Sequence, residues 1–465
     1  MQGVSTRWLP FADVASEKLS MRRLLRLSLF QVSVALSVVL LSGTLNRIMV
    51  VELGQPAWLV SLMVAMPLLL APARALIGYR SDHHRSYLGW RRVPYLWFGT
   101  LLQFGGLAIM PFALIVMTEP HNGPVWLGSA AAMLAFALVG AGLHTTQTAG
   151  LALATDIATP ETRSRVVAFL YTLLLLGTIF ASVGFAGLLA DFTYIRLIKV
   201  LQGAAMLTAA LNLVALWKQE VRRPDLTRHD QVRPSFAAVW REFSKTGRPR
   251  RLLLGVGLGT VGFSMQDILL EPYGAQILGM SVSETTSLTA IWALGMLAAF
   301  VISARLLSDQ RDPIRVAASG AVIGVFAFAT VIFAGPLHST ILFYSGVLGI
   351  GLGGGFFAVG TLSAVMSLGA QQHTGLALGA WGAVNATATG VAIFAGGALR
   401  DLFSMLSHRG VVDPLLDSAV SAYGAVYHLE ILMLFLALIA LGPIVRTGPI
   451  DAEQHSSFGL ADFPA

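Results

Sequence analysis

Two carboxylates stand inside an apolar stretch of the sequence, where ionisable side chains are rare. Asp267 and Glu271 occur in the segment QDILLEPYG, residues 266–274. Because they are four residues apart, they share one face of a helix. An ionisable group inside a membrane costs roughly 2.5–3.5 kcal/mol on insertion scales and usually faces a partner or a cavity. The pair therefore predicts a ligand or ion contact, a buried ion pair that fixes helix register, or exposure at a helix end.

Arg47 lies in a second apolar stretch, at a similar depth. Counting about 1.5 Å per residue from the inner ends of the two stretches places Arg47, Asp267 and Glu271 together in the outer half of the membrane. We expect Arg47 to form an ion pair with Glu271 or with Asp267. Pro272 removes a backbone donor, so we also expect a kink in the helix at that position.

A further polar group is the sequence HTTQ at residues 144–147. A neutral imidazole can give one axial bond to a metal held in a ring, but a lone histidine in a membrane more often hydrogen-bonds to a neighbouring helix. Both interpretations remain open for His144 and Gln147. Weaker candidates are Asn385, His428 and Glu430, the last two predicted to lie near the outer surface.

No catalytic constellation accompanies these residues. The chain has no cysteine, which removes thiolate nucleophiles, disulfides and thiolate-held metals. The string GIGLGG at 349–354 matches the dinucleotide fingerprint, but it sits in an apolar stretch with no preceding strand, so close helix packing explains it better. No zinc-protease, nucleotide-binding or hydrolase motif occurs elsewhere. The sequence therefore predicts no enzyme, no nucleotide and no metal site.

The elements that hold these side chains are predicted to be membrane-spanning helices. Of 465 residues, 55% are hydrophobic and 12% charged, and mean hydropathy is +0.72, which excludes a water-soluble enzyme. The net charge of +7 falls in the predicted loops, so we expect no nucleic acid partner. Each crossing needs about 20 apolar residues. Twelve stretches qualify: 25–51, 56–78, 93–117, 125–155, 166–190, 194–217, 252–277, 284–304, 315–335, 340–368, 374–399 and 424–445.

The basic residues predict the orientation and the division of the chain. Lys and Arg concentrate in alternate loops, which places both termini in the cytoplasm. The polar stretch 218–251 holds ten basic and four acidic residues and separates six spans from six. It is either a solvated linker or carries a short amphipathic helix at 236–243. We expect an N-terminal half at 1–217, the linker at 218–251, a C-terminal half at 252–445 and a cytoplasmic tail at 446–465.

Each half carries a charged turn between its second and third spans. The repetition suggests a duplicated bundle and resembles the major facilitator superfamily, although four extra residues follow the first aspartate and a histidine replaces a basic residue. The resemblance implies that these turns latch the two halves on the cytoplasmic side, and a role in topology alone is equally compatible. The candidates for the latch are Asp82, Arg91, Arg92, Asp309 and Arg311.

Several sequence blocks carry a closer resemblance. They are WLPFADVA at 8–15, LSLFQVSV at 27–34, GTLNR at 43–47, QDILLEPYG at 266–274, GAWGAVNAT at 379–387 and FGLADFP at 458–464. Together they resemble the bacteriochlorophyll delivery family, a branch of the major facilitator superfamily that includes PucC and LhaA. The likeness extends along nearly the whole chain and implies an all-α membrane protein with a six-plus-six bundle of twelve helices.

The resemblance also implies a function. Family members are associated with assembling the light-harvesting antenna of purple bacteria, with bacteriochlorophyll as cargo and antenna alpha and beta polypeptides as partners in the inner, intracytoplasmic photosynthetic membrane. Further partners would be the reaction centre core complex and pigment-synthesis enzymes. Asp267, Glu271, Arg47, His144, Gln147 and Asn385 would then be pigment or ion contacts. The resemblance leaves open whether the protein serves the peripheral or the core antenna. The competing hypotheses are a proton- or ion-coupled transporter of a small solute and a pigment-free scaffold for antenna helices.

Overall fold

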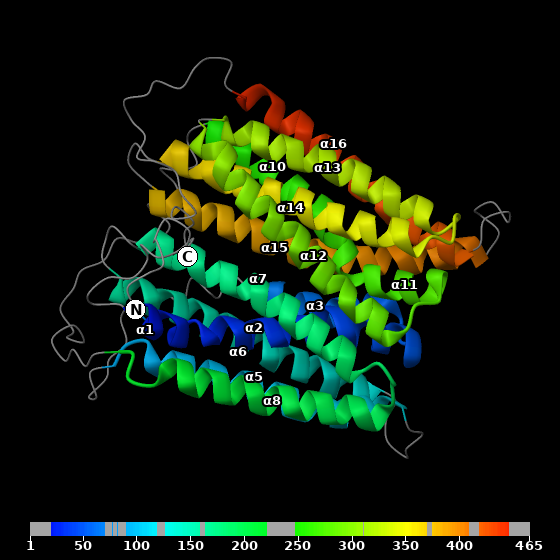
Figure 1. Cartoon of the computed structure of the whole chain (residues 1–465). Coiled ribbons are helices and arrows are strands. Elements are labelled where there is room, and N and C mark those ends of the chain that lie inside the picture. Colours follow the sequence, from blue (N-terminus) through cyan, green and yellow to red (C-terminus); the bar gives the residue numbers. More distant parts are fainter. Residues whose placement is uncertain are drawn as a thin grey trace, which may run out of the picture.

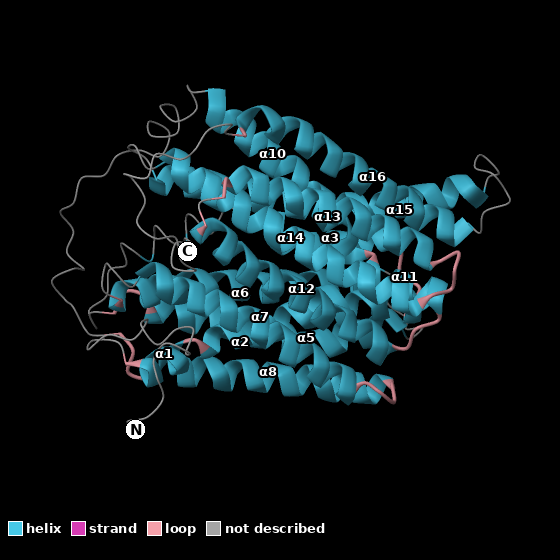
Figure 2. Ribbon diagram, turned by 45° about the horizontal axis from the view of Figure 1, so that its top comes forward, coloured by secondary structure: helices cyan, strands magenta, loops and turns pink. Residues whose placement is uncertain are grey.

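The computed structural model consists of helices and loops throughout the part of the chain that it describes (Figures 1 and 2). The described residues are 20–69, 77, 81, 90–118, 126–158, 163–220, 247–309, 311–369, 374–408 and 418–445. Helices dominate because a chain in hydrocarbon must pair every backbone amide and carbonyl within itself. The predicted all-α membrane fold is confirmed.

The first bundle begins with one continuous, irregular rod. It comprises α1 (Met21–Leu27), α2 (Leu29–Val38) and two stretches of π-helical turns, η2 (Val39–Leu45) and η3 (Ile48–Glu52). The remaining helices of this bundle are α3 (Ala57–Leu69), α5 (Val93–Thr118), α6 (Trp126–Ile157), α7 (Arg163–Leu188) and α8 (Tyr194–Leu216).

The second bundle begins with a broken rod. It comprises α10 (Gly247–Ser264), a 3₁₀ turn η5 (Met265–Ile268) and α11 (Leu270–Leu278), and the helices on either side of the break are inclined by 47°. The remaining helices are α12 (Val282–Ser308), α13 (Pro313–Ala334), α14 (Thr340–Gly369), α15 (Thr374–His408) and α16 (Ser418–Leu441), followed by the short turn η6 (Gly442–Ile444).

Ten helices among the described residues are long and apolar enough to cross a membrane, and the broken rod makes eleven if it counts as one span. Helix α3 is shorter, and its predicted span 56–78 continues into residues 70–76, which lie outside the described ones. The total of twelve crossings and the exact half and linker boundaries therefore stay predictions.

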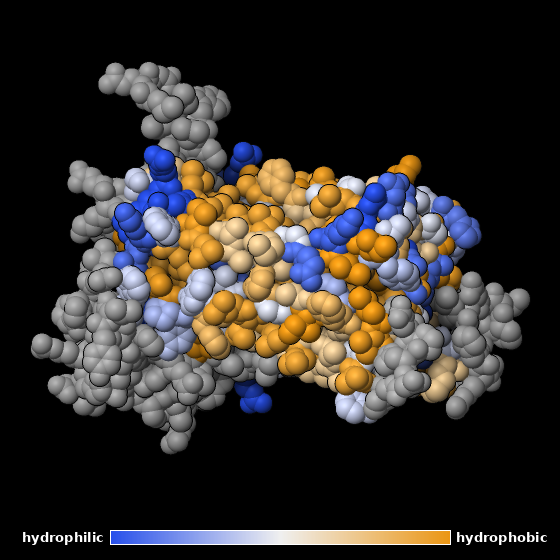
Figure 3. All heavy atoms as spheres, turned by 90° about the horizontal axis from the view of Figure 1, so that it is seen from below, coloured by the Kyte–Doolittle hydropathy of each residue, from blue (hydrophilic) through white to orange (hydrophobic). Residues whose placement is uncertain are grey.

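The two bundles lie side by side (Figure 1) and meet where α3 packs on α15 and α7 packs on α12. The start of α1 and the end of α16 lie at the same end of the molecule in Figure 1. Apolar side chains cover most of the middle of the face in Figure 3, and hydrophilic ones gather toward its two ends. This distribution is that of a protein surrounded by lipid at its waist.

Candidate functional site

The break in the seventh predicted span lies one turn before Pro272. A proline has no amide hydrogen, and its ring collides with the carbonyl four residues earlier, which here belongs to Ile268. The chain therefore leaves the α-helix at Met265–Ile268 and resumes it at Leu270. The sequence correctly predicted a distortion from Pro272, and the structure places it at the preceding turn.

Asn46 crosses from the first bundle to this break. Its side-chain amide donates a hydrogen bond of 3.0 Å to the carbonyl oxygen of Ile268. Asn46 is completely buried and lies between the π-helical turns η2 and η3. Such turns often occur at functional sites. The irregular part of the first rod thus meets the irregular part of the seventh.

The two predicted carboxylates also lie at the break. Glu271 is only 6% exposed, and its Oε1 accepts a hydrogen bond of 3.1 Å from the hydroxyl of Thr289 in α12. Asp267 is partly exposed and accepts a hydrogen bond from the side-chain amide of Gln266. Among the described residues, neither carboxylate has a lysine, arginine or histidine within ion-pair distance.

The predicted ion pair between Arg47 and Glu271 or Asp267 is wrong. Arg47 instead binds Glu52, five residues further along the same rod. In π-helical turns, residues five apart lie above one another, because the backbone hydrogen bonds run from i to i+5. The structure has such turns at Ile48–Glu52, so Arg47 finds its partner within its own rod.

Glu430 also contacts the helix break, although the sequence indicated it only as a weaker candidate. Its side chain is completely buried near the middle of α16, and its predicted depth near the outer surface of the membrane stays a prediction. One of its oxygens accepts a hydrogen bond of 2.7 Å from the backbone amide of Gln266. Glu430 thereby replaces a backbone acceptor that the broken helix does not supply. The signal was a lone glutamate within an apolar run.

A cavity of about 340 Å³ lies beside the break, between the two bundles. Its walls come from α2, η2, α3, α6 and α7 of the first bundle and from η5, α11, α12 and α15 of the second. The candidates that line it are Asp267, Glu271, His144 and Gln147. Arg47 and Asn385 are not among the lining residues, and Asn385 accepts a hydrogen bond of 2.8 Å from Thr260. The structure thus brings four of the six predicted contact residues to one cavity.

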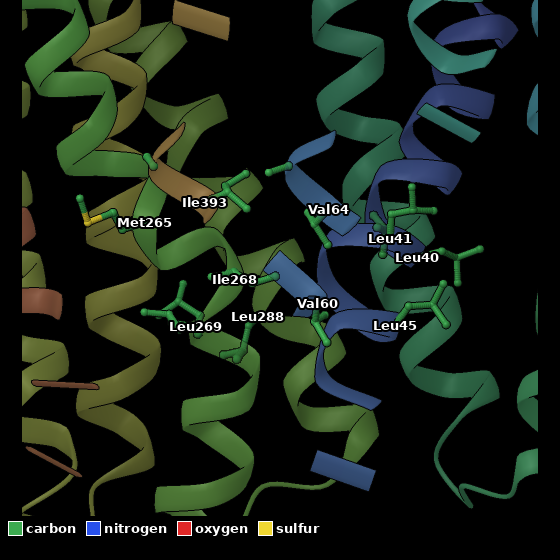
Figure 4. Close-up of a cluster of buried hydrophobic side chains, with 14 of the residues drawn as sticks. Leu40, Leu41, Leu45, Val60, Val64, Met265, Ile268, Leu269, Leu288 and Ile393 are labelled. Carbon is green, nitrogen blue, oxygen red and sulfur yellow. The ribbon is translucent and has the colours of Figure 1, made fainter. Parts of the chain in front are cut away.

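Apolar side chains from both bundles close the seam around this cavity (Figure 4). Leu41 and Val64 from the first bundle face Leu288 and Ile393 from the second, and all four line the cavity. Where water would otherwise reach the seam, packing these side chains together removes apolar surface of both bundles from water. This burial favours contact between the bundles.

Polar contacts across the seam accompany the apolar ones. The hydroxyls of Thr44 and Thr286 lie 3.4 Å apart, and the hydroxyl of Ser182 donates to the carbonyl of Thr286. The backbone amide of Trp58 donates a 2.8 Å hydrogen bond to Asp401. The hydrogen bond of Trp58 joins α3 to α15. The contacts of Thr44 and Ser182 join the first rod and α7, respectively, to α12. All of these contacts lie on the side of the cavity away from the start of α1.

The structure describes four of the five predicted latch residues: Arg91, Arg92, Asp309 and Arg311. Arg91 and Arg92 both bind Asp156 in α6, at 3.1 and 3.0 Å. Asp309 ends α12, where its backbone amide donates to the carbonyl of Arg305, and Arg311 is exposed. Asp82 lies outside the described residues. The ion pairs described for the two arginines are within the first bundle, and a latch between the bundles stays a prediction.

The chemistry available at the cavity is binding and proton exchange. No group of three or more His, Asp or Glu side chains capable of holding a metal ion occurs in the described part of the chain. A single axial bond from His144 to a ring-bound metal stays a prediction.

The sequence of the chain was compared with known protein families and with known proteins. A family model described as PUCC protein matches residues 44–448. The chain belongs to the PucC family. This PucC-family chain is 51% identical over 404 residues to Protein PucC of Rhodovulum sulfidophilum, covering 86% of this chain and 89% of the relative. It is 50% identical over 464 residues to an uncharacterised protein in the puhA-bchM intergenic region of Rhodobacter capsulatus, covering 98% and 97%.

More distant comparisons concern the fold. A bacteriochlorophyll synthase 44.5 kDa chain of Rhodobacter capsulatus is 27% identical over 438 residues, covering 92% of this chain and 96% of the relative. Among solved structures, the peptide transporter POT superposes with a TM-score of 0.67 at 15% identity, covering 92% of this PucC-family chain and 96% of the transporter. A bacterial homologue of the lysosomal transporter Spinster, in an inward-facing conformation, gives 0.66 at 14% identity, covering 90% and 95%. The major facilitator-like bundle is confirmed.

Proposed function

We propose that this PucC-family protein assists assembly of the purple-bacterial light-harvesting antenna by holding bacteriochlorophyll in the membrane and releasing it to antenna alpha and beta polypeptides. The observation that carries the proposal is the family match along residues 44–448, together with 51% identity to a Protein PucC. The sequence blocks that resemble the bacteriochlorophyll delivery family supply the cargo and the partners.

The size of the cavity favours a lipid-facing site for the pigment. At about 340 Å³ the cavity is at the lower end of the range of roughly 300–1,000 Å³ for drug-sized ligands. Bacteriochlorophyll is a large macrocycle with a long apolar tail, so it needs a surface open to lipid. Large apolar side chains are available there on the first bundle: Phe98, Phe112, Phe180, Ile195 and Met206 are all more than half exposed.

The remaining parts of the proposal follow from the positions of the basic residues, which predict the orientation, and from the same family resemblance. Both termini lie in the cytoplasm, the membrane is the bacterial inner, intracytoplasmic photosynthetic membrane, and the reaction centre core complex and pigment-synthesis enzymes are further partners. The protein carries out no chemistry on the pigment. The cavity residues Asp267, Glu271, His144 and Gln147 fit the ion contacts of the prediction better than the pigment contacts.

The test is an absorption spectrum of the gently solubilised protein, with an inventory of the subunits that co-purify. We expect a near-infrared pigment band and antenna polypeptides, and we expect deletion of the gene to lower the antenna content of the membranes. Pigment-free protein together with normal antenna assembly after deletion would overturn the proposal. Antenna polypeptides without a pigment band would instead indicate a scaffold.

A second candidate function is coupled transport of a small solute. It is favoured by the likeness to solved transporters and by the acidic pair at a cavity between the two bundles. Reconstituted uptake that is lost in Asp267→Asn would support it. Absence of solute flux in protein that retains a pigment band would support delivery.

A further inference from the structure

The carboxyl groups at the cavity have no positive partners among the described residues. Asp267 and Glu271 both line it, and the nearby cation Arg47 is bound to Glu52 instead. The side chain that donates a hydrogen bond to Glu271 is the neutral hydroxyl of Thr289. Two carboxyl groups that flank the helix break and line the same low-dielectric cavity favour a ligand that brings positive charge.

Gln266 provides an independent observation at the same place. It is 1% exposed and lines the cavity, and its Oε1 has no hydrogen-bond donor. Its Nε2 is already used, because it donates to the carbonyl of Phe263 at 3.1 Å and to Asp267. A buried acceptor left without a donor is unfavourable. Three side chains of this segment therefore offer acceptor oxygens to a ligand with several donors: Gln266, Asp267 and Glu271.

The size and the remaining lining narrow the chemistry of that ligand. About 340 Å³ is far more than a bare ion fills, and no cluster of three metal-binding side chains occurs in the described residues. Trp292 and Leu288 also line the cavity. An aromatic face attracts an organic cation through its quadrupole, and the leucine suits an apolar substituent.

We propose that this cavity binds a small organic cation that carries a protonated amine. The ammonium donates to the carboxylates of Asp267 and Glu271 and to the amide oxygen of Gln266, and the apolar part rests on Leu288 and Trp292. Because the cavity is also lined by Leu41 and Val64 of the first bundle, the bound cation contacts both bundles. This site is separate from the lipid-facing surface proposed for the pigment.

The proposal is tested with the full-length protein in lipid nanodiscs and phenethylamine, which is protonated at pH 7. Binding is measured by calorimetry and by the rise in the unfolding temperature. We expect phenethylamine to bind and to stabilise the protein, whereas 2-phenylethanol, a neutral molecule of the same shape, does not. Equal effects of the two compounds, no effect of either, or the same stabilisation by potassium chloride alone would overturn the proposal.

Variants locate the site. We expect Glu271→Gln and Asp267→Asn each to weaken phenethylamine binding by about tenfold or more, as expected when a charge-assisted hydrogen bond is lost. The Glu271→Gln variant keeps a side-chain oxygen that accepts the hydrogen bond from Thr289, so we expect this variant to fold. The matched control is Asp191→Asn, which removes an exposed carboxylate paired with Arg196 and leaves binding unchanged. Undiminished binding in both cavity variants would overturn the proposal, whereas absence of a pigment band would affect only the proposed function.

Discussion

Asn46 completes the hydrogen bonding of a helix in the opposite bundle. Its amide lies 3.0 Å from the carbonyl oxygen of Ile268, the group that residue 272 would bond in an unbroken α-helix. Pro272 has no hydrogen to give. The side chain of one bundle therefore supplies the donor that the backbone of the other lacks, and the vacant carbonyl becomes a point of attachment between them.

This relationship predicts a coupling between two distant positions in the sequence. We expect Asn46→Ala to lower the stability of the protein by about 1–3 kcal/mol, because the buried carbonyl of Ile268 loses its donor. In a Pro272→Ala background the restored amide can serve that carbonyl, so Asn46→Ala should cost clearly less. Thermal unfolding of the four proteins in detergent measures the coupling as a double-mutant cycle. Additive effects of the two substitutions would contradict this account.

Gly43 marks a close approach between the first rod and the acidic pair. A Cβ added at Gly43 would lie 2.9 Å from the hydroxyl of Thr289 and 3.2 Å from Oε1 of Glu271. We expect Gly43→Ala to push Thr289 and Glu271 apart and to destabilise the protein by about 1–3 kcal/mol.

The matched control for this prediction is Gly203→Ala in α8, where nothing lies within 4 Å of the added atom. Its unfolding temperature should be unchanged or slightly raised, since alanine favours a helix more than glycine does. If the two variants had equal unfolding temperatures, the tight contact at Gly43 would not exist.

The ion pair of Arg47 with Glu52 predicts that removing one partner lowers the stability of the protein more than removing the other. Arg47 is 5% exposed, whereas the side chain of Glu52 is 31% exposed. Glu52→Gln leaves a buried cation without its counter-charge and should lower stability by about 1.5–3 kcal/mol. Arg47→Met leaves only a partly exposed carboxylate and should cost less.

The double variant of this pair should recover part of the loss from Glu52→Gln, because no unpaired buried charge remains. Unfolding temperatures of the two single variants and the double variant provide the measurement. A Glu52→Gln variant as stable as the unchanged protein would show that Arg47 has another partner.

Much of the helical fold could be predicted from hydropathy alone. The predicted spans 93–117 and 194–217 agree within a residue with α5 (Val93–Thr118) and α8 (Tyr194–Leu216). These ends are well marked in the sequence, by Pro94 and by the charged residues that follow α8. Polar residues inside spans likewise indicated Asp267 and Glu271, and both line the cavity. The single helix face predicted for them is interrupted, because Asp267 lies in the 3₁₀ turn η5 and Glu271 in α11.

The partners of two buried charged side chains, Arg47 and Glu430, could not be predicted in this way. The partner of Arg47 depends on π-helical turns, which shift its neighbour from i+4 to i+5 and leave no periodicity in a uniformly apolar stretch. The burial of Glu430 depends on the break at Gln266, to which it supplies an acceptor. The contact of Glu430 joins segments that are more than 100 residues apart, and a single sequence does not specify that packing.

Glu220 predicts a role for the segment just after α8. Its carboxylate accepts hydrogen bonds from the backbone amides of Arg91, Arg92 and Val93, at 2.7 to 3.1 Å, and so covers the start of α5. An anion at this end of a helix also interacts favourably with the helix dipole. We expect Glu220→Ala to lower stability by about 1–2 kcal/mol.

Glu220→Gln should cost less than Glu220→Ala, because the amide oxygen still accepts a hydrogen bond although the charge is lost. Hydrogen exchange of the amides at 91–93 reports on the same contact and should accelerate in the alanine variant. Unchanged exchange at these three amides would refute the capping role.

The seam between the bundles can be locked by a disulfide, because the chain has no cysteine of its own. The hydroxyls of Thr44 and Thr286 lie 3.4 Å apart across the seam, so a Thr44→Cys, Thr286→Cys pair needs only a small movement to reach disulfide geometry. We expect the pair to cross-link under mild oxidation, and the single variants not to. If pigment is handled at the lipid-facing surface, cells that carry the cross-linked protein should still assemble antenna, as measured by the near-infrared absorption of their membranes. Loss of antenna that returns on reduction would show that the bundles must separate at this seam, and would favour the transporter hypothesis.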